Sequence, residues 1–129
     1  MAEATLSAPK QGRALNIAVW VVSALLCALF LFASYPKLTG DPRAVEGFRK
    51  LYTDGFRLFI GTCEMLGAIA LLIPRLAFWS ACGLLIIMIG AMYTHVANDD
   101  VANIGGAVIA FVGCAFIAWA RRGRALFLS

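Results

Sequence analysis

The sequence predicts an all-α integral membrane protein built as a four-helix bundle, and both composition and patterning lead to this fold class. Of the 129 residues, 62% are apolar and 14% are charged, whereas a soluble domain is about half apolar and about a quarter charged. The mean hydropathy of +0.86 points the same way. A chain this short cannot hide so much apolar surface from water, and a disordered chain would need low hydrophobicity. A soluble domain and a disordered protein are therefore excluded.

Four long apolar runs organise the chain. A helix needs about 20 apolar residues, at about 1.5 Å each, to cross the hydrocarbon core of a bilayer. The runs must be helical because lipid offers no partner to unpaired backbone groups, and they are too long for barrel strands. We expect membrane spans over about 14–36, 57–74, 76–95 and 101–120.

The first apolar run resembles a secretory signal only superficially. Its apolar stretch is too long, and Lys37 follows where a small-residue cleavage site would be expected. We therefore expect a retained span. No linker or shift in composition divides the chain, which predicts a single domain over 1–129, with a flexible N-terminal tail at 1–12 and a basic C-terminal tail at 121–129.

Two of the connections between spans are short. Pro74 and Arg75 predict an abrupt hairpin between the second and third spans, and residues 95–100 form a short acidic turn before the fourth.

The long connection between the first two spans predicts structure of its own. Asp41 can cap a helix whose first residue is Pro42, a position that proline favours. We expect an amphipathic helix over about 42–53, lying at the membrane interface. An ordered loop with scattered aromatic residues is the alternative. The apolar face of the helix would consist of Val45, Phe48, Leu51 and Tyr52.

The basic residues favour both termini on the cytoplasmic side, with a small bias. Four spans place both termini on one side, which would carry six Lys and Arg residues against five on the other side. The five are diluted by Asp41, Glu46 and Asp54. We therefore expect a multi-pass membrane protein with both termini cytoplasmic. We expect its membrane to be a bacterial inner membrane.

Counted between their flanking titratable residues, the four apolar runs (14–36, 58–74, 76–94 and 101–120) contain one charged residue, Glu64. It lies seven residues after Arg57, so about 10 Å into the span at helical rise. An ionisable group at such a depth costs about 3 kcal/mol on insertion scales. Glu64 must therefore face the bundle interior, a polar cavity or a partner. Small residues on the same helix face, namely Gly61, Gly67 and Ala68, would let another helix approach closely.

The topology predicts that Lys37 and His95 lie at the same end of the bundle as Glu64. The first span ends there, the second begins there, and the third returns there. An acid, a base and an imidazole in one place predict a polar intramembrane pocket for proton transfer or ligand polarisation. The alternatives are that Glu64 makes an interhelical ion pair, that Lys37 extends to the interface, and that His95 has no role.

Other candidate sites have weaker patterns. Met88, Met92 and His95 share a helix face and are ligand types that suit copper, but methionine is also an ordinary filler of apolar packing, and we expect no metal. The sequence contains no C-x-x-C motif, the pattern that would indicate redox chemistry of the cysteine thiols. No phosphate loop, zinc spacing or nucleotide fingerprint is present, and the basic residues do not gather as a nucleic-acid-binding face would require. The four cysteines, one in each span, are Cys27, Cys63, Cys82 and Cys114.

Three segments resemble the DoxX-like family of small four-helix membrane proteins. They are FASYPKLTG at Phe32–Gly40, FIGTCEMLGAIALLIPR at Phe59–Arg75 and GAMYTHV at Gly90–Val96. The resemblance is clearest over 17–96. The family pattern has a lysine just after the first span, E-x-x-G within the second, and an end to the third that tolerates an acid or a histidine. In this sequence it falls on Lys37, on Glu64 with Gly67, and on His95.

The resemblance implies two classes of function. The family is named after a subunit associated with thiosulfate:quinone oxidoreductase, and other members are linked to oxidative-stress and thiol systems. This favours a quinone- or thiol-linked redox accessory subunit, in which Glu64 and His95 move protons and Lys37 polarises a carbonyl oxygen. The alternative is a non-catalytic membrane scaffold or assembly factor. Besides the lipid bilayer, the expected partners are a membrane or redox protein or a second copy of the chain.

Overall fold

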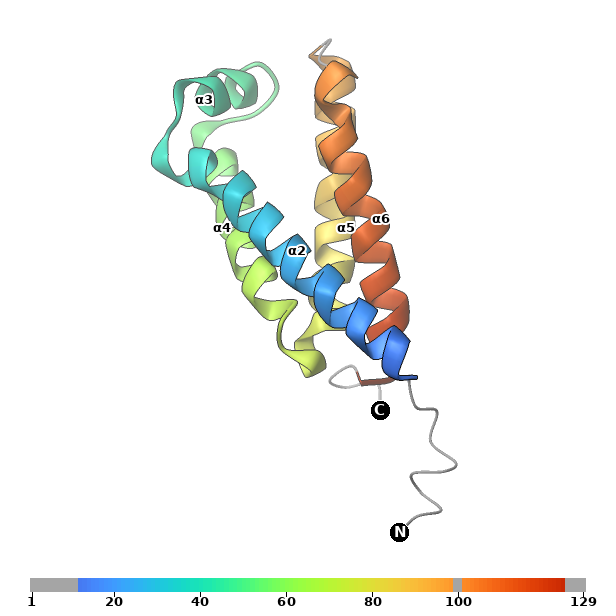
Figure 1. The fold of residues 1–129 in the computed structure, drawn as a ribbon. Coiled ribbons are helices and arrows are strands. Elements are labelled where there is room, and N and C mark those ends of the chain that lie inside the picture. Colours follow the sequence, from blue (N-terminus) through green and yellow to red (C-terminus); the bar gives the residue numbers. More distant parts are fainter. Residues whose placement is uncertain (1–11, 99–100, 125–129) are drawn as a thin grey trace.

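The computed structural model describes residues 12–98 and 101–124, and within these ranges the secondary structure is helical, without strands (Figure 1). The predicted all-α class is therefore confirmed. The α-helices are α2 (Arg13–Thr39), α3 (Pro42–Arg49), α4 (Asp54–Ala70), α5 (Pro74–Ala97) and α6 (Ile104–Arg121), and two 3₁₀ turns, η1 (Val101–Asn103) and η2 (Arg122–Arg124), flank α6.

The longer helices pack as two pairs. Helix α2 packs along α4, and α5 packs along α6, while contacts between α4 and α5 and between α2 and α6 join the pairs. The pairs lie close at the end where α2 begins and α6 ends, and they diverge toward the end that carries α3 (Figure 1). Close approach depends on small residues: a Cβ atom on Gly67 would lie 3.0 Å from Leu84, and one on Gly113 would lie 2.9 Å from Leu26.

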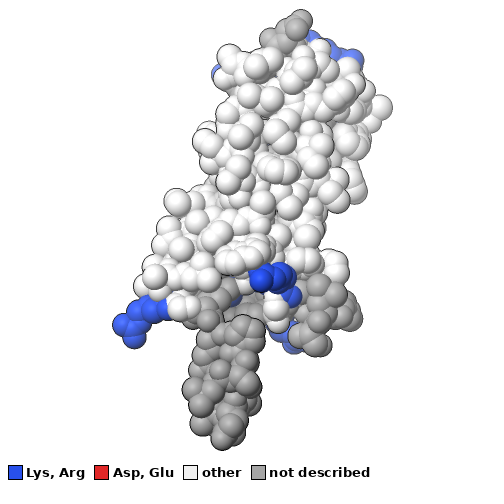
Figure 2. Space-filling view, turned by 90° about the vertical axis from the view of Figure 1, so that its right-hand side faces the viewer, with Lys and Arg blue, Asp and Glu red and all other residues white. Residues whose placement is uncertain are grey.

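Among the described residues, three helices, α2, α5 and α6, are long and apolar enough to cross a membrane. Helix α4 has 17 residues. Large apolar side chains are exposed along these helices, and Phe32 on α2 is 80% exposed. Figure 2 shows a face of the molecule whose middle carries no charged side chain, with basic side chains toward both of its ends. Contiguous exposed apolar surface of this kind indicates contact with lipid.

Two helix boundaries near proline differ from the sequence prediction. Helix α2 continues through Pro36 and Lys37, and it ends because Gly40 takes the left-handed conformation (φ 79°) that favours glycine. The predicted hairpin at Pro74 and Arg75 is wrong in position. Pro74 instead begins α5, since a proline at the first helical position loses no hydrogen bond, and the turn occupies 71–73.

The connection helix is shorter than predicted. The Asp41 cap is confirmed, because its Oδ1 accepts a hydrogen bond from the backbone N–H of Arg43 at 3.0 Å. Helix α3 then ends at Arg49, so Leu51 and Tyr52 lie in the turn that leads to α4. Thr53 caps α4 in turn, accepting a hydrogen bond from the N–H of Phe56.

The predicted tails lie mostly outside the described residues. Of the N-terminal tail at 1–12, the structure describes only Gly12, and the C-terminal tail at 121–129 is described as far as Arg124. Arg121 belongs to the last turn of α6, and η2 follows it directly.

Candidate functional site

Lys37 and Glu64 form an ion pair between α2 and α4. The Lys37 Nζ atom lies 2.9 Å from Oε1 of Glu64, whose side chain is only 3% exposed, against 19% for Lys37. The Lys37 ammonium also donates a hydrogen bond to the carbonyl of Ala33 at 3.0 Å. The contact with Glu64 joins opposite charges at 2.9 Å. The buried acid therefore has a counter-charge on the neighbouring helix.

One face of α4 holds Lys37 in place. A Cβ atom on Gly61 would lie 3.0 Å from the Lys37 Cβ, so the backbone of α4 approaches Lys37 as closely as a glycine permits. Arg57, on the same face, donates a hydrogen bond from its guanidinium to the Lys37 carbonyl. That carbonyl lies in the last turn of α2, where helix carbonyls lack intrahelical partners. Arg57, Gly61 and Glu64 thus contact the carbonyl, the Cβ and the ammonium of one residue.

Arg57 was not among the residues that the sequence singled out. It is 7% exposed although it stands at the boundary of an apolar run. The signal that could have found it is its spacing, because Arg57, Gly61 and Glu64 fall on one helix face at i, i+4 and i+7.

A second ion pair lies next to Arg57, at the exposed start of α4. Arg49 donates two hydrogen bonds to the Asp54 carboxylate, at 3.2 and 2.9 Å. The Arg57 Nε lies 3.9 Å from Asp54 Oδ1. Hydrogen bonds from Arg49 lower the pKa of Asp54 below its ordinary value, and the same pairing raises the pKa of Arg49. This pair ties the end of α3 to the start of α4, outside the apolar run.

The three predicted site residues line one cavity of about 920 Å³. It lies where the two helix pairs diverge, with Lys37 on α2, Glu64 on α4 and His95 on α5. The rest of the wall is largely apolar and aromatic, and residues of α3 line its outer part. The structure thus brings Lys37 and Glu64 into contact and places His95 on the wall of the same cavity. The aromatic lining consists of Phe32, Tyr35, Phe48, Tyr52, Phe56 and Phe59.

A hydrogen bond links the connection to α5 beside this cavity. The Tyr52 hydroxyl lies 2.9 Å from Oγ1 of Thr94, the residue before His95. Thr94 also donates to the carbonyl of Gly90 at 2.8 Å, which leaves its oxygen to accept from Tyr52. The Tyr52 ring packs against Phe56 with centroids 4.8 Å apart. Tyr52 therefore joins three elements that line the cavity.

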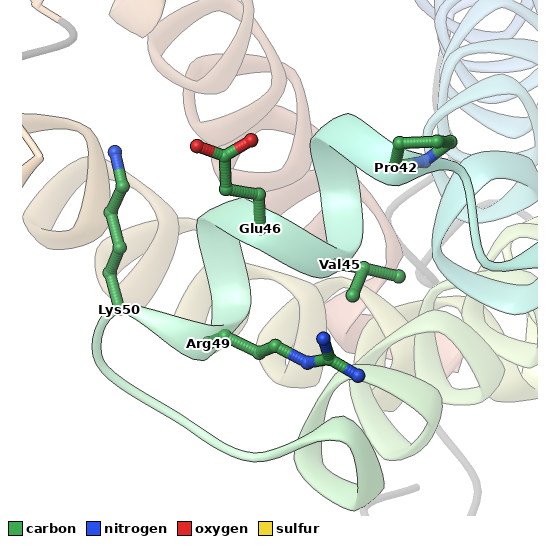
Figure 3. Close-up of a pocket in the computed structure, with 5 residues that line it drawn as sticks. All are labelled: Pro42, Val45, Glu46, Arg49 and Lys50. Atoms are coloured by element: carbon green, nitrogen blue, oxygen red, sulfur yellow. The ribbon is translucent and has the colours of Figure 1, made fainter.

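A shallower hollow of about 520 Å³ lies on α3 itself (Figure 3). Arg49 points from α3 toward α4, while Glu46 and Lys50 extend from the other side of the helix (Figure 3). None of the predicted site residues lines this hollow. It is a surface feature of the connection and not part of the candidate site.

The methionine and cysteine candidates from the sequence are buried or half-buried side chains of the helices. Met88 is buried in the core, and among the described residues no group of three or more His, Cys, Asp or Glu side chains could hold a metal ion. All four cysteines are free thiols; Cys27 and Cys114 are buried, and Cys63 and Cys82 are half-buried.

The comparison with known proteins bears on the whole site. No curated protein and no solved structure matches the chain. Residues 21–122 match the DoxX-like family, a range that includes Lys37, Glu64 and His95. Since the match covers most of the sequence and agrees with the motifs around these residues, the chain belongs to the DoxX-like family.

Proposed function

We propose that this membrane protein is a redox accessory subunit that binds a quinone headgroup in the cavity between α2, α4 and α5. The observation that carries the proposal is the Lys37–Glu64 ion pair, which lines a largely apolar and aromatic cavity together with His95. Ligand sites of this kind combine apolar walls with a few converging polar groups. A quinone has the matching chemistry, with a flat ring for aromatic contacts and carbonyl oxygens that accept hydrogen bonds.

The proposal includes four membrane crossings. Helix α4 begins beside α3 and passes the chain to α5, which begins at the opposite end of the molecule (Figure 1). If α2 and α5 cross the bilayer, the segment between them must return across it. Short length is no obstacle, because a bilayer thins or flanking groups extend to accommodate a short span. Ser80 of α5 donates a hydrogen bond to the Gly67 carbonyl of α4 at 2.6 Å, which holds these two helices side by side.

The chain's own residues have distinct roles in this proposal. The Lys37 ammonium donates a hydrogen bond to a carbonyl oxygen of the ligand, while Glu64 and His95 hold protons on either side of it. Reduction of a quinone to a quinol takes up two electrons and two protons, and a partner redox protein supplies the electrons. Apolar walls exclude water, which strengthens the polar contacts within the cavity.

Quinone binding is tested by thermal unfolding of the detergent-purified protein with a short-chain ubiquinone or menaquinone analogue. We expect the analogue to raise the midpoint of the wild type, since a ligand that binds only the folded state stabilises it. Glu64→Gln should lose most of this shift. Asp54→Asn is the matched control, because it breaks an ion pair outside the cavity and should keep the shift. Absence of a shift in the wild type would overturn the proposal.

The outer face of α6 favours a second candidate, a non-catalytic scaffold for a membrane complex. Ile109 and Val112 are exposed there, and nothing lies within 4 Å of a Cβ atom placed on Gly105 or Gly106. Small residues on an exposed helix face allow another helix to approach closely. In this case Ile109→Trp should reduce recovery of a partner complex, while quinone analogues leave the melting midpoint unchanged.

A further inference from the structure

The end of the molecule farthest from α3 carries only basic charge among the described residues. Helix α2 begins there, α5 begins there and α6 ends there (Figure 1). The four described acids, Asp41, Glu46, Asp54 and Glu64, all belong to the other end. The basic residues of this arginine end whose side chains the structure describes are Arg13, Arg75, Arg121 and Arg122.

The opposite end is balanced by its own acids. Lys37 is paired with Glu64 at 2.9 Å, and Arg49 is paired with Asp54 at 2.9 Å. Arg57 lies beside the same Asp54 carboxylate. Internal pairing therefore offsets much of the positive charge near α3, whereas Arg13, Arg75 and Arg122 are exposed at an end to which none of the four described acids belongs.

Tryptophan residues indicate where the arginine end lies relative to the lipid headgroups. All three tryptophans, Trp20, Trp79 and Trp119, lie near this end on α2, α5 and α6, and all are exposed. The Arg121 guanidinium lies 5.0 Å from the Trp20 ring centroid, and that of Arg122 lies 5.0 Å from the Trp119 centroid. Indole rings collect at the level of the lipid headgroups. The arginines stacked on them are therefore held at the level of the lipid phosphates.

We propose that the arginine end is a binding surface for anionic phospholipid headgroups. Arg13, Arg75 and Arg122 are exposed, and a guanidinium presents a fork of donors that matches a phosphate. Arg121 is fully buried, and its contact with Trp20 fixes the position of that ring. Basic groups at the bilayer surface are attracted to anionic lipid and lose this attraction as salt screens it. This surface is separate from the cavity and does not depend on quinone binding.

Native mass spectrometry of the full chain tests the proposal, with phosphatidylglycerol and phosphatidylcholine as probes. We expect the wild type to retain phosphatidylglycerol at least several-fold more than phosphatidylcholine. The triple variant Arg13→Gln, Arg75→Gln, Arg122→Gln should lose this preference. A matched control, Arg43→Gln, Arg49→Gln, Lys50→Gln, removes the same charge from the α3 end and should keep it. Equal retention of the two lipids by the wild type, or equal losses in both triple variants, would overturn the proposal.

A charge-conserving variant separates lipid binding from folding. If the glutamine triple variant does not fold, the corresponding triple replacement by lysine keeps the positive charge and removes only the guanidinium fork. It should retain a preference for phosphatidylglycerol that falls as salt rises. A preference that is unchanged by salt would contradict an electrostatic headgroup site. Inorganic phosphate at matched ionic strength should not replace the bound lipid, since the acyl chains also hold the lipid against exposed apolar side chains of the helices.

Discussion

The Lys37 ammonium lies 2.9 Å from Oε1 of Glu64, although the two residues stand on different helices and within or beside apolar runs. Neither charge is a surface charge: Glu64 is buried, and Lys37 is mostly so. For such a pair, desolvation of both groups opposes their attraction, so its net contribution to stability is small. Removal of one partner is different, because it leaves the other charge uncompensated. This asymmetry leads to a test of the pair itself.

Removing either charge of the pair should destabilise the fold. Removing both charges should cost less than the sum of the two single losses. We expect Glu64→Gln and Lys37→Met each to lower the free energy of unfolding by about 3 kcal/mol, toward the low end for a buried pair because Lys37 is partly exposed. The double variant should be markedly more stable than the sum of the single losses predicts. Denaturant unfolding in a fixed detergent measures all three. Additive losses would contradict a direct Lys37–Glu64 interaction.

Close contact between α2 and α4 at Gly61 gives a second prediction. A Cβ atom on Gly61 would lie 3.0 Å from Lys37 Cβ and 3.1 Å from the Leu38 side chain, so Gly61→Ala must push the helices apart. We expect a loss of about 1–3 kcal/mol, as for other overpacked sites. Gly83→Ala is the matched control on α5, since nothing lies within 4 Å of its Cβ position. It should be neutral or stabilising by up to about 1 kcal/mol.

Much of this arrangement could be predicted from the sequence because a membrane restricts the available folds. Apolar runs specify where helices lie, and each crossing reverses the direction of the chain. Reversal alone brings the end of one run next to the start of the next, which is why Lys37 could be placed near Glu64. The depth of Glu64 in its apolar run led to the other expectation, because an acid two turns inside a span requires a counter-charge or a polar cavity.

The features that the sequence did not predict depend on particular contacts. In the sequence, Arg57 is one of several charged residues at the boundary of an apolar run. It is buried because its guanidinium donates a hydrogen bond to a carbonyl in the last turn of α2 that has no partner within the helix. The early end of α3 at Arg49 is decided by the pairing of that arginine with Asp54 and by the turn that carries Tyr52 to Thr94. The cavity exists because the two helix pairs diverge, and an apolar pattern specifies buried faces but not the angle between helices.

The Tyr52–Thr94 hydrogen bond gives a third prediction, about the connection. Tyr52→Phe keeps the ring that packs on Phe56 and removes only the hydroxyl that lies 2.9 Å from Thr94. We expect faster amide hydrogen exchange over 41–53, corresponding to a loss of about 0.5–1.5 kcal/mol in local stability. Tyr93→Phe removes a hydroxyl from an exposed neighbour on α5 and should leave exchange in this segment unchanged. Equal effects of the two variants would argue against the link.

The Arg49–Asp54 pair predicts how the link between α3 and α4 responds to pH. Pairing with Arg49 lowers the pKa of Asp54 below its ordinary value of 3.8. A group whose pKa is lowered on folding stabilises the fold above its unfolded pKa, and this stabilisation is lost as the pH falls through the folded pKa. Asp54→Asn should therefore lower the melting midpoint at pH 6, and its difference from wild type should shrink as the pH falls below about 3.8. Arg49→Gln should behave alike, and the double variant should be no less stable than either single one. Glu46→Gln is the control, because it removes an acid from α3 without changing the Arg49–Asp54 pair. Its difference in melting midpoint from the wild type should not shrink at low pH in this way. If it does, the acid sensitivity comes from net charge and not from the Arg49–Asp54 contact.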